Sequence, residues 1–164
     1  MLSPLQQFGL YGERWVSRKL NDLGYKVSML PDFCHPACDL IIEGILPCEV
    51  KLARATTRKR KKSDGSWTAY RRWQWNVSAI QNGDKVLILI AQDYDSMLYP
   101  FIMPANVMEF RPHFQITSHP KKYTGLIAPF LNNWSVVKFL LSKRYKSRPD
   151  DERETWEVHH AHRS

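Results

Sequence analysis

Residues 39–51, DLIIEGILPCEVK, decide the fold, because they hold two short apolar runs joined by a Glu-Gly pair. Glu43-Gly44 has the composition of a tight hairpin turn, so residues 39–42 and 45–52 are predicted to form two antiparallel strands. Pro47 cannot donate a hydrogen bond to a neighbouring strand, which places its part of the second strand at an edge or a bulge.

Three charged residues of this hairpin are predicted to gather at one end of the sheet. Asp39 opens the first strand, and Glu49 and Lys51 lie late in the second. Side chains alternate between the two faces of a strand, so Glu49 and Lys51 point the same way while Val50 points into the opposite layer. The E-x-K spacing therefore places a carboxylate and an amine on one face.

A helix is predicted before the hairpin, over residues 4–23. Ser3-Pro4 is a good helix start, apolar residues then recur at spacings of three and four, and Gly24 supplies a left-handed stop. Glu13 falls at the margin of the buried face, from which its carboxylate can face a cleft.

The rest of the chain alternates between strands and polar segments. Residues 54–65 are basic and without apolar periodicity, which predicts a mobile loop. Residues 70–80 match both a strand and a helix, and their aromatic and β-branched content favours a strand over 69–77. Further strands are predicted at residues 25–30, 85–91, 98–103 and 113–117, and a closing helix through residues 134–141.

A chain of 164 residues is long enough for one compact domain. We assign residues 1–142 to that domain and 143–164 to a charged tail predicted to be disordered. Residues 1–149 carry 22 basic and 11 acidic side chains, a net charge of +11. Such an excess attracts polyanions, of which nucleic acids and anionic membranes are the commonest.

The sequence favours an intracellular protein, cytoplasmic or nucleoid-associated, with no membrane partner. Its apolar runs are far shorter than the roughly 20 residues that a membrane span needs. The N-terminal stretch MLSPLQQFGL has no positively charged start and no small-residue cleavage site. Three cysteines are an odd number, which suits reduced thiols better than a disulfide framework.

Two carboxylates and a lysine can supply what phosphodiester hydrolysis requires. The reaction needs a divalent ion to polarise the phosphate, a hydroxide and a cation for the developing charge. Mg²⁺ prefers oxygen ligands, which Asp39 and Glu49 offer. Lys51 can stabilise the attacking hydroxide or the transition-state charge, and Glu13 can tune the metal or hold a second one.

The helix with Glu13, the stretch DLIIEGILPCEVK, the basic segment and the apolar strand together resemble the PD-(D/E)xK nuclease superfamily over about residues 5–110. Their order is similar to Holliday-junction resolvases and to small restriction-like or homing endonucleases. Residues 48–108 also resemble uncharacterised PD-(D/E)xK-like proteins.

The resemblance implies a restriction-endonuclease-like α/β core of αβββαβ type, with a mixed central sheet flanked by helices. It implies a DNA endonuclease that depends on Mg²⁺, for which Mn²⁺ substitutes. The metal ligands would be Asp39, Glu49 and the backbone carbonyl of Val50, with Lys51 catalytic and Glu13 accessory.

One letter of the motif departs from the family pattern. The first acidic residue of the PD-(D/E)xK motif should directly follow a proline, but Asp39 follows Cys38. The pair Pro31-Asp32 does match this part of the motif. Asp39 is preferred because it opens a strand paired with the E-V-K strand, and Asp32 stays the alternative.

Substrate contacts are predicted in the segment from Lys51 to Arg72, where nine basic residues stand against one acid. A charge density of this kind can neutralise several phosphates. The residues predicted to bind nucleic acid are Arg54, Arg58, Lys59, Arg60, Lys61, Lys62, Arg71 and Arg72. Gln74 is a candidate accessory residue near the metal, although a structural polar role is the stronger reading.

Three hypotheses follow. The first is a Mg²⁺-dependent DNA endonuclease, for which symmetric cutting of both strands would favour a homodimer. The second is a basic module with the nuclease fold that binds nucleic acid without cutting it. The third is a zinc protein using Cys34, His35 and Cys38, which lack a second Cys/His pair at ligand spacing.

Overall fold

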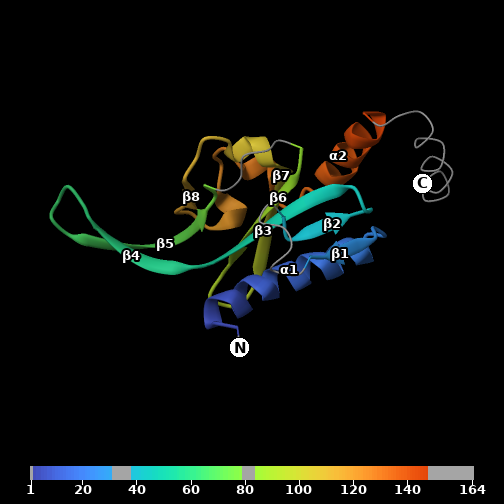
Figure 1. Cartoon of the computed structure of the whole chain (residues 1–164). Coiled ribbons are helices and arrows are strands. Elements are labelled where there is room, and N and C mark those ends of the chain that lie inside the picture. The colour runs from blue at the N-terminus through green and yellow to red at the C-terminus, as the bar shows by residue number, and fades with distance from the viewer. Residues whose placement is uncertain (1, 31–37, 79–83, 148–164) are drawn as a thin grey trace.

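Five strands form the central sheet of the molecule (Figure 1). The computed structural model describes residues 2–30, 38–78 and 84–147. In space the strands follow the order β1-β2-β3-β6-β7, with β3 and β6 parallel and the other neighbouring pairs antiparallel. The mixed sheet confirms the predicted α/β class. Its strands are β1 Val27–Met29, β2 Leu40–Ile42, β3 Leu46–Arg54, β6 Val86–Gln92 and β7 Leu98–Pro104.

The predicted hairpin is confirmed by the turn between β2 and β3. Glu43 and Gly44 have φ angles of 51° and 70°, and the N–H of Ile45 donates to the carbonyl of Ile42 at 3.1 Å. Two successive positive φ angles are the geometry that joins antiparallel strands most tightly. Pro47 pairs with β2 before the first β3–β6 pair, Cys48↔Val86, so at this point β3 is bordered by β2 alone among the described strands.

Both helices pack on one face of the central sheet. Side chains of α1 (Pro4–Asp22) and α2 (Ser135–Lys146) share a core with the even-numbered residues of β6. Ser3 and Gln6 form a capping box at the start of α1, and Gly24 beyond its end has a φ of 90°. The predicted first and closing helices are confirmed.

Strands cover the opposite face. β4 (Thr56–Lys61), β5 (Trp67–Asn76) and β8 (His113–Ile116) form a second sheet in the order β4-β5-β8, which confirms the strands predicted at 69–77 and 113–117. Two buried tryptophans of β5 fasten it to β6, because the indole N–H groups of Trp73 and Trp75 donate to backbone carbonyls at 2.9 and 3.1 Å. Three 3₁₀ turns complete this layer, η1 Ala105–Met108, η2 Pro120–Lys122 and η3 Ala128–Phe130.

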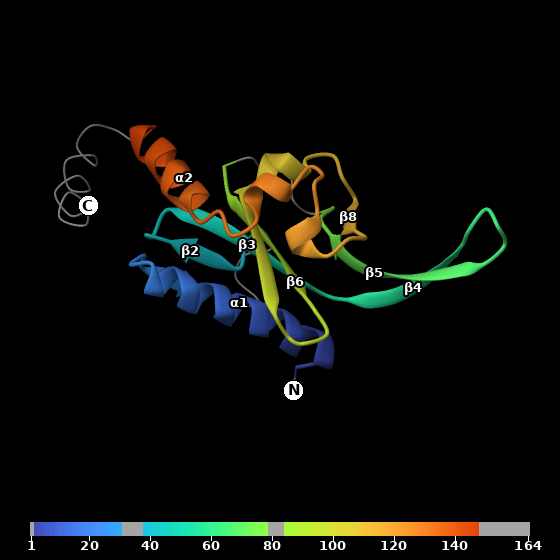
Figure 2. The same cartoon turned by 180° about the vertical axis from the view of Figure 1, so that it is seen from behind.

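β4 and β5 form a long ribbon that reaches away from the rest of the molecule (Figure 1 and Figure 2). The prediction of a mobile loop over residues 54–65 was wrong, since β3 runs to Arg54 and β4 pairs with β5 from Thr56 to Lys61. All six side chains of β4 are exposed. Apolar alternation, the usual signal of a strand, is absent because neither face of this strand is buried.

The ribbon also changes the predicted order of elements. An αβββαβ order implies a helix after the third strand of the sheet. In the described residues, the chain between the parallel strands β3 and β6 forms β4 and β5 instead. The fold class stands, whereas this connection differs from the family pattern.

The C-terminal boundary lies later than predicted. α2 continues to Lys146, four residues beyond the boundary placed at residue 142. The rest of the predicted tail, from residue 148, lies outside the described residues. Among the described helices, none is long and apolar enough to cross a membrane.

Candidate active site

Glu49 and Lys51 lie on the face of β3 that points away from both helices. Their partners on β6 are Leu87 and Leu89, which belong to the core between the two sheets, whereas Val50 packs in the core beneath the helices. Glu49 is 6% exposed, and its Oε1 forms an ion pair with Nζ of Lys51. The alternation predicted from the E-x-K spacing is confirmed.

Asp39 lies directly across the hairpin from Glu49. Its N–H donates to the carbonyl of Cys48 at 2.9 Å, and extending the β2–β3 register by one residue places it opposite Glu49. Its Oδ2 accepts a hydrogen bond from the N–H of Val50 at 2.7 Å. The structure thus brings together Asp39, Glu49 and Lys51, as predicted, while the alternative acid Asp32 lies outside the described residues.

The two facing carboxylates repel one another in a site of low solvation. Burial raises the pKa of Asp39, and the neighbouring Glu49 raises it further. The Val50 N–H, Lys51 and Lys85 lower this pKa in part. A divalent cation between the carboxylates would relieve the same repulsion, because it favours the charged form of both.

Lys85 is a site residue that the sequence analysis missed. It precedes β6 and is 6% exposed, and its Nζ lies 4.0 Å from Oε2 of Glu49. Lysine is almost never buried unless it is paired. The signal in the sequence was a lysine directly before the apolar run 86–91, which we interpreted only as the start of a strand.

Two buried thiols border the carboxylates. Cys38 and Cys48 are free cysteines. Burial, followed by the negative charges of Asp39 and Glu49, raises the pKa of Cys48 well above its usual value. Burial and the charge of Glu49 raise the pKa of Cys38 as well. Cys34 and His35, the other residues of the zinc hypothesis, lie outside the described residues.

Glu13 is carried on α1 beside the strand that holds Lys51. It is half-buried and directly follows Gly12, against which the Cβ of Leu52 packs. Within the described residues, Glu13 does not join Asp39 and Glu49 in a group of three potential metal ligands. Its accessory role stays a prediction.

The arrangement fits a hard divalent ion held by two carboxylates. Asp39 and Glu49 supply oxygen ligands on adjacent strands, and burial followed by the charge of Glu49 raises the pKa of Asp39. Mg²⁺ is commonly bound by one or two carboxylates, with water and substrate phosphate completing its coordination. The Val50 carbonyl remains a predicted third ligand.

The residues predicted to bind nucleic acid divide into two groups. Arg58, Lys59, Arg60, Lys61 and Lys62 are exposed on the ribbon and form no ion pair with another described residue. Three arginines lie nearer the body. Arg54 stacks on Phe8 at 4.0 Å, Arg71 is paired with Asp93, and the buried Nε of Arg72 has no hydrogen-bond partner in the described parts of the chain.

Gln74 is not brought to the carboxylates. It is exposed on the face of β5 opposite Trp73 and Trp75, and those two side chains point toward the central sheet. The accessory role near the metal therefore has no support in this geometry.

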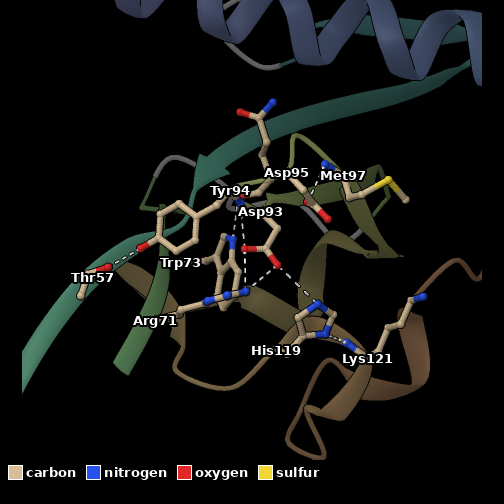
Figure 3. Close-up of polar contacts among 10 residues, drawn as sticks. Thr57, Arg71, Trp73, Asp93, Tyr94, Asp95, Met97, His119 and Lys121 are labelled. Carbon is tan, nitrogen blue, oxygen red and sulfur yellow. Dashed lines mark hydrogen bonds and ion pairs between the residues drawn. The ribbon is translucent and has the colours of Figure 1, made fainter. Parts of the chain in front are cut away.

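A second polar cluster lies at the root of the ribbon (Figure 3). Asp93, 8% exposed, accepts from Nη1 of Arg71 at 3.0 and 2.8 Å and from the N–H of Tyr94 at 2.8 Å. Nε2 of His119 lies 3.4 Å from its Oδ2. The hydroxyls of Thr57 and Tyr94 are hydrogen-bonded, which ties β4 to the same point. No sequence motif pointed to this cluster, because its members are scattered over four segments.

The fold has a counterpart among solved structures, although the sequence alone finds none. No protein-family model matches the chain. No curated protein matches it either. The structure of a bacterial homing endonuclease, I-Ssp6803I, is similar with a TM-score of 0.58 and 16% identity, over 90% of this chain and 100% of that chain. At this identity the likeness shows a shared fold, so the class defined is a mixed α/β domain with the fold of that homing endonuclease.

Proposed function

We propose that this chain is a metal-dependent endonuclease that hydrolyses DNA phosphodiester bonds with Mg²⁺ as cofactor. The observation that carries the proposal is the placement of Asp39 opposite Glu49, with Lys51 on the same face as Glu49. The fold shared with a homing endonuclease supports it. The basic ribbon supplies the charge that a DNA backbone requires.

Each residue has a distinct role in this proposal. Asp39 and Glu49 would hold the metal with the Val50 carbonyl, and Glu13 is an accessory acid. A bound Mg²⁺ would supply polarisation of a phosphate oxygen and would lower the pKa of a bound water. Lys51, about a third exposed, reaches the solvent side of the site and stabilises negative charge on the hydroxide or the phosphate. Lys85 contacts the other oxygen of Glu49 and is a positioning residue.

Cleavage of supercoiled plasmid tests the proposal. Wild-type protein should nick or linearise the plasmid with Mg²⁺ or Mn²⁺, and EDTA should stop the reaction. Asp39→Asn and Glu49→Ala should lose it, and the exposed-carboxylate control Glu109→Gln should keep it. Equal activity of wild type and both site variants would remove the assignment.

A second candidate is a nucleic-acid-binding module that has this fold without catalysis. The observation that favours it is the pairing of Glu49 with both Lys51 and Lys85, which balances the carboxylate without a metal. This candidate predicts salt-dependent DNA binding that Asp39→Ala leaves unchanged. Detection of a metal-dependent cleavage product eliminates it.

A further inference from the structure

The ribbon has two chemically different faces. Cross-strand partners share a face, and the register pairs Arg58 with Tyr70, Arg60 with Thr68, and Thr56 with Arg72. The same face continues onto β8 through Gln74↔Gln115 and Asn76↔His113. These side chains all carry hydrogen-bonding groups, and most of them are exposed.

At the root of the ribbon, the other face turns toward the body of the molecule. Trp73 and Trp75 belong to it and are buried against the central sheet, and Arg71 belongs to it and binds Asp93. Farther along the ribbon this face carries Lys59 and Lys61. Within β4, arginines therefore lie on the face that is outward at the root of the ribbon, and the exposed lysines lie on the opposite face.

This division matches two kinds of contact with DNA. The planar guanidinium of arginine binds guanine edges in bidentate fashion, and glutamine and asparagine do the same with adenine. Lysine acts as a point charge that suits phosphates.

The ribbon is also fixed in place before any ligand arrives. Figure 3 shows Arg71 and His119 directed at Asp93, with Thr57 held by Tyr94. Contacts of this kind lower the entropy that binding would otherwise cost. The six paired residues of β4 span roughly 20 Å, or about six base-pair steps.

We propose that the outward face of the β4-β5-β8 sheet reads base edges in the major groove of B-form DNA, while Lys59 and Lys61 contact phosphates. The inference rests on the proposed function and adds sequence specificity to it. The B-DNA major groove admits a two-stranded ribbon, whereas the deep, narrow groove of A-form RNA does not.

Selection from DNA duplexes with a randomised central segment tests the proposal, with full-length protein in EDTA so that bound duplexes stay uncut. Wild-type protein should enrich a defined motif. Arg58→Ala and Gln115→Ala should each relax one position of that motif, with discrimination reduced by about 5- to 150-fold. Lys59→Ala should keep the motif, weaken binding to every duplex and lower the salt slope by about 0.9.

Three results would overturn the inference: no enriched motif, equal effects of Arg58→Ala and Lys59→Ala on every sequence, or equal binding to duplex RNA. Thermal unfolding checks that the variants, all at exposed positions, remain folded. Plasmid cleavage by the same wild-type preparation separates the two proposals. Mg²⁺-dependent cleavage without an enriched motif would support the nuclease proposal and contradict base reading by the outward face. An enriched motif without cleavage would support base reading and contradict the nuclease proposal.

Discussion

Nζ of Lys85 lies 4.0 Å from Oε2 of Glu49, and each side chain is only 8% exposed. Of the charged residues that the structure describes, these two and Asp93 are the buried ones. A buried charge is stabilised mainly by its partner, so substitutions of Glu49 and Lys85 should have coupled effects on the free energy of unfolding.

Glu49→Gln should lower the free energy of unfolding of the metal-free protein by about 3 kcal/mol, because it removes the carboxylate charge that faces the buried ammonium of Lys85. Lys85→Met in the same chain should restore a large part of that loss. Urea unfolding in EDTA measures both. A double variant no more stable than Glu49→Gln would show that the pair is not coupled.

Asp39→Asn should stabilise the metal-free protein at neutral pH. The folded-state pKa of Asp39 is raised by burial and by Glu49, so its ionised form costs stability at pH values above that pKa. The cost disappears as the pH falls below the unfolded pKa, near 4. Asparagine can still accept the Val50 hydrogen bond. Melting temperatures in EDTA should therefore be higher for the variant at pH 7 and similar near pH 3.

Lys51→Met should reduce the single-turnover rate of plasmid cleavage by about 10²- to 10³-fold, as expected for loss of a group that stabilises transition-state charge. Binding of Mn²⁺, measured by calorimetry, should persist, because both carboxylates remain. Loss of Mn²⁺ binding together with activity would instead indicate that Lys51 only maintains the site.

Asp93→Asn should loosen the root of the ribbon and cost about 1–2 kcal/mol of stability, since a charged, two-bond contact with Arg71 becomes a neutral one. Limited digestion with trypsin should cut faster within residues 58–62. Asp95→Asn is a matched control, because Asp95 is exposed and accepts a hydrogen bond from the nearby Met97 N–H. Identical digestion of the two variants would contradict the role of Asp93.

Two glycines of α1 make a matched pair for the contact between helix and site strand. A Cβ on Gly12 would lie 3.1 Å from the Cβ of Leu52, whereas one on Gly9 meets nothing within 4 Å. Gly9→Ala should stabilise the protein by about 0.8–1 kcal/mol through helix propensity. Gly12→Ala gains the same helix propensity, but Leu52 must shift by a few tenths of an ångström to admit the new methyl group. Relative to Gly9→Ala, this variant should therefore destabilise the protein by about 1–2 kcal/mol. Chemical unfolding of both variants measures the difference.

The sequence predicted the hairpin and its charged residues because local rules determine them. Glu43-Gly44 suits two positive φ angles, and strand alternation alone places Glu49 beside Lys51. The ribbon was not predicted because the residues of an exposed strand do not alternate between apolar and polar. Lys85 escaped because its contact with Glu49 spans 36 residues and depends on the parallel pairing of β3 with β6, which the local pattern did not reveal.

β3 passes from the central sheet into the ribbon with a single residue, Ala55, between its last residue and the first of β4. The proposed catalytic residues of β3 and the proposed base-reading residues of β4 would then lie on one continuous segment of the chain. Arg58 lies seven positions after Lys51 in the sequence, or roughly 23 Å along a strand. The position of the cut would keep a constant offset from the bases recognised. Exchange of outward side chains would redirect the protein to a new target without altering its core.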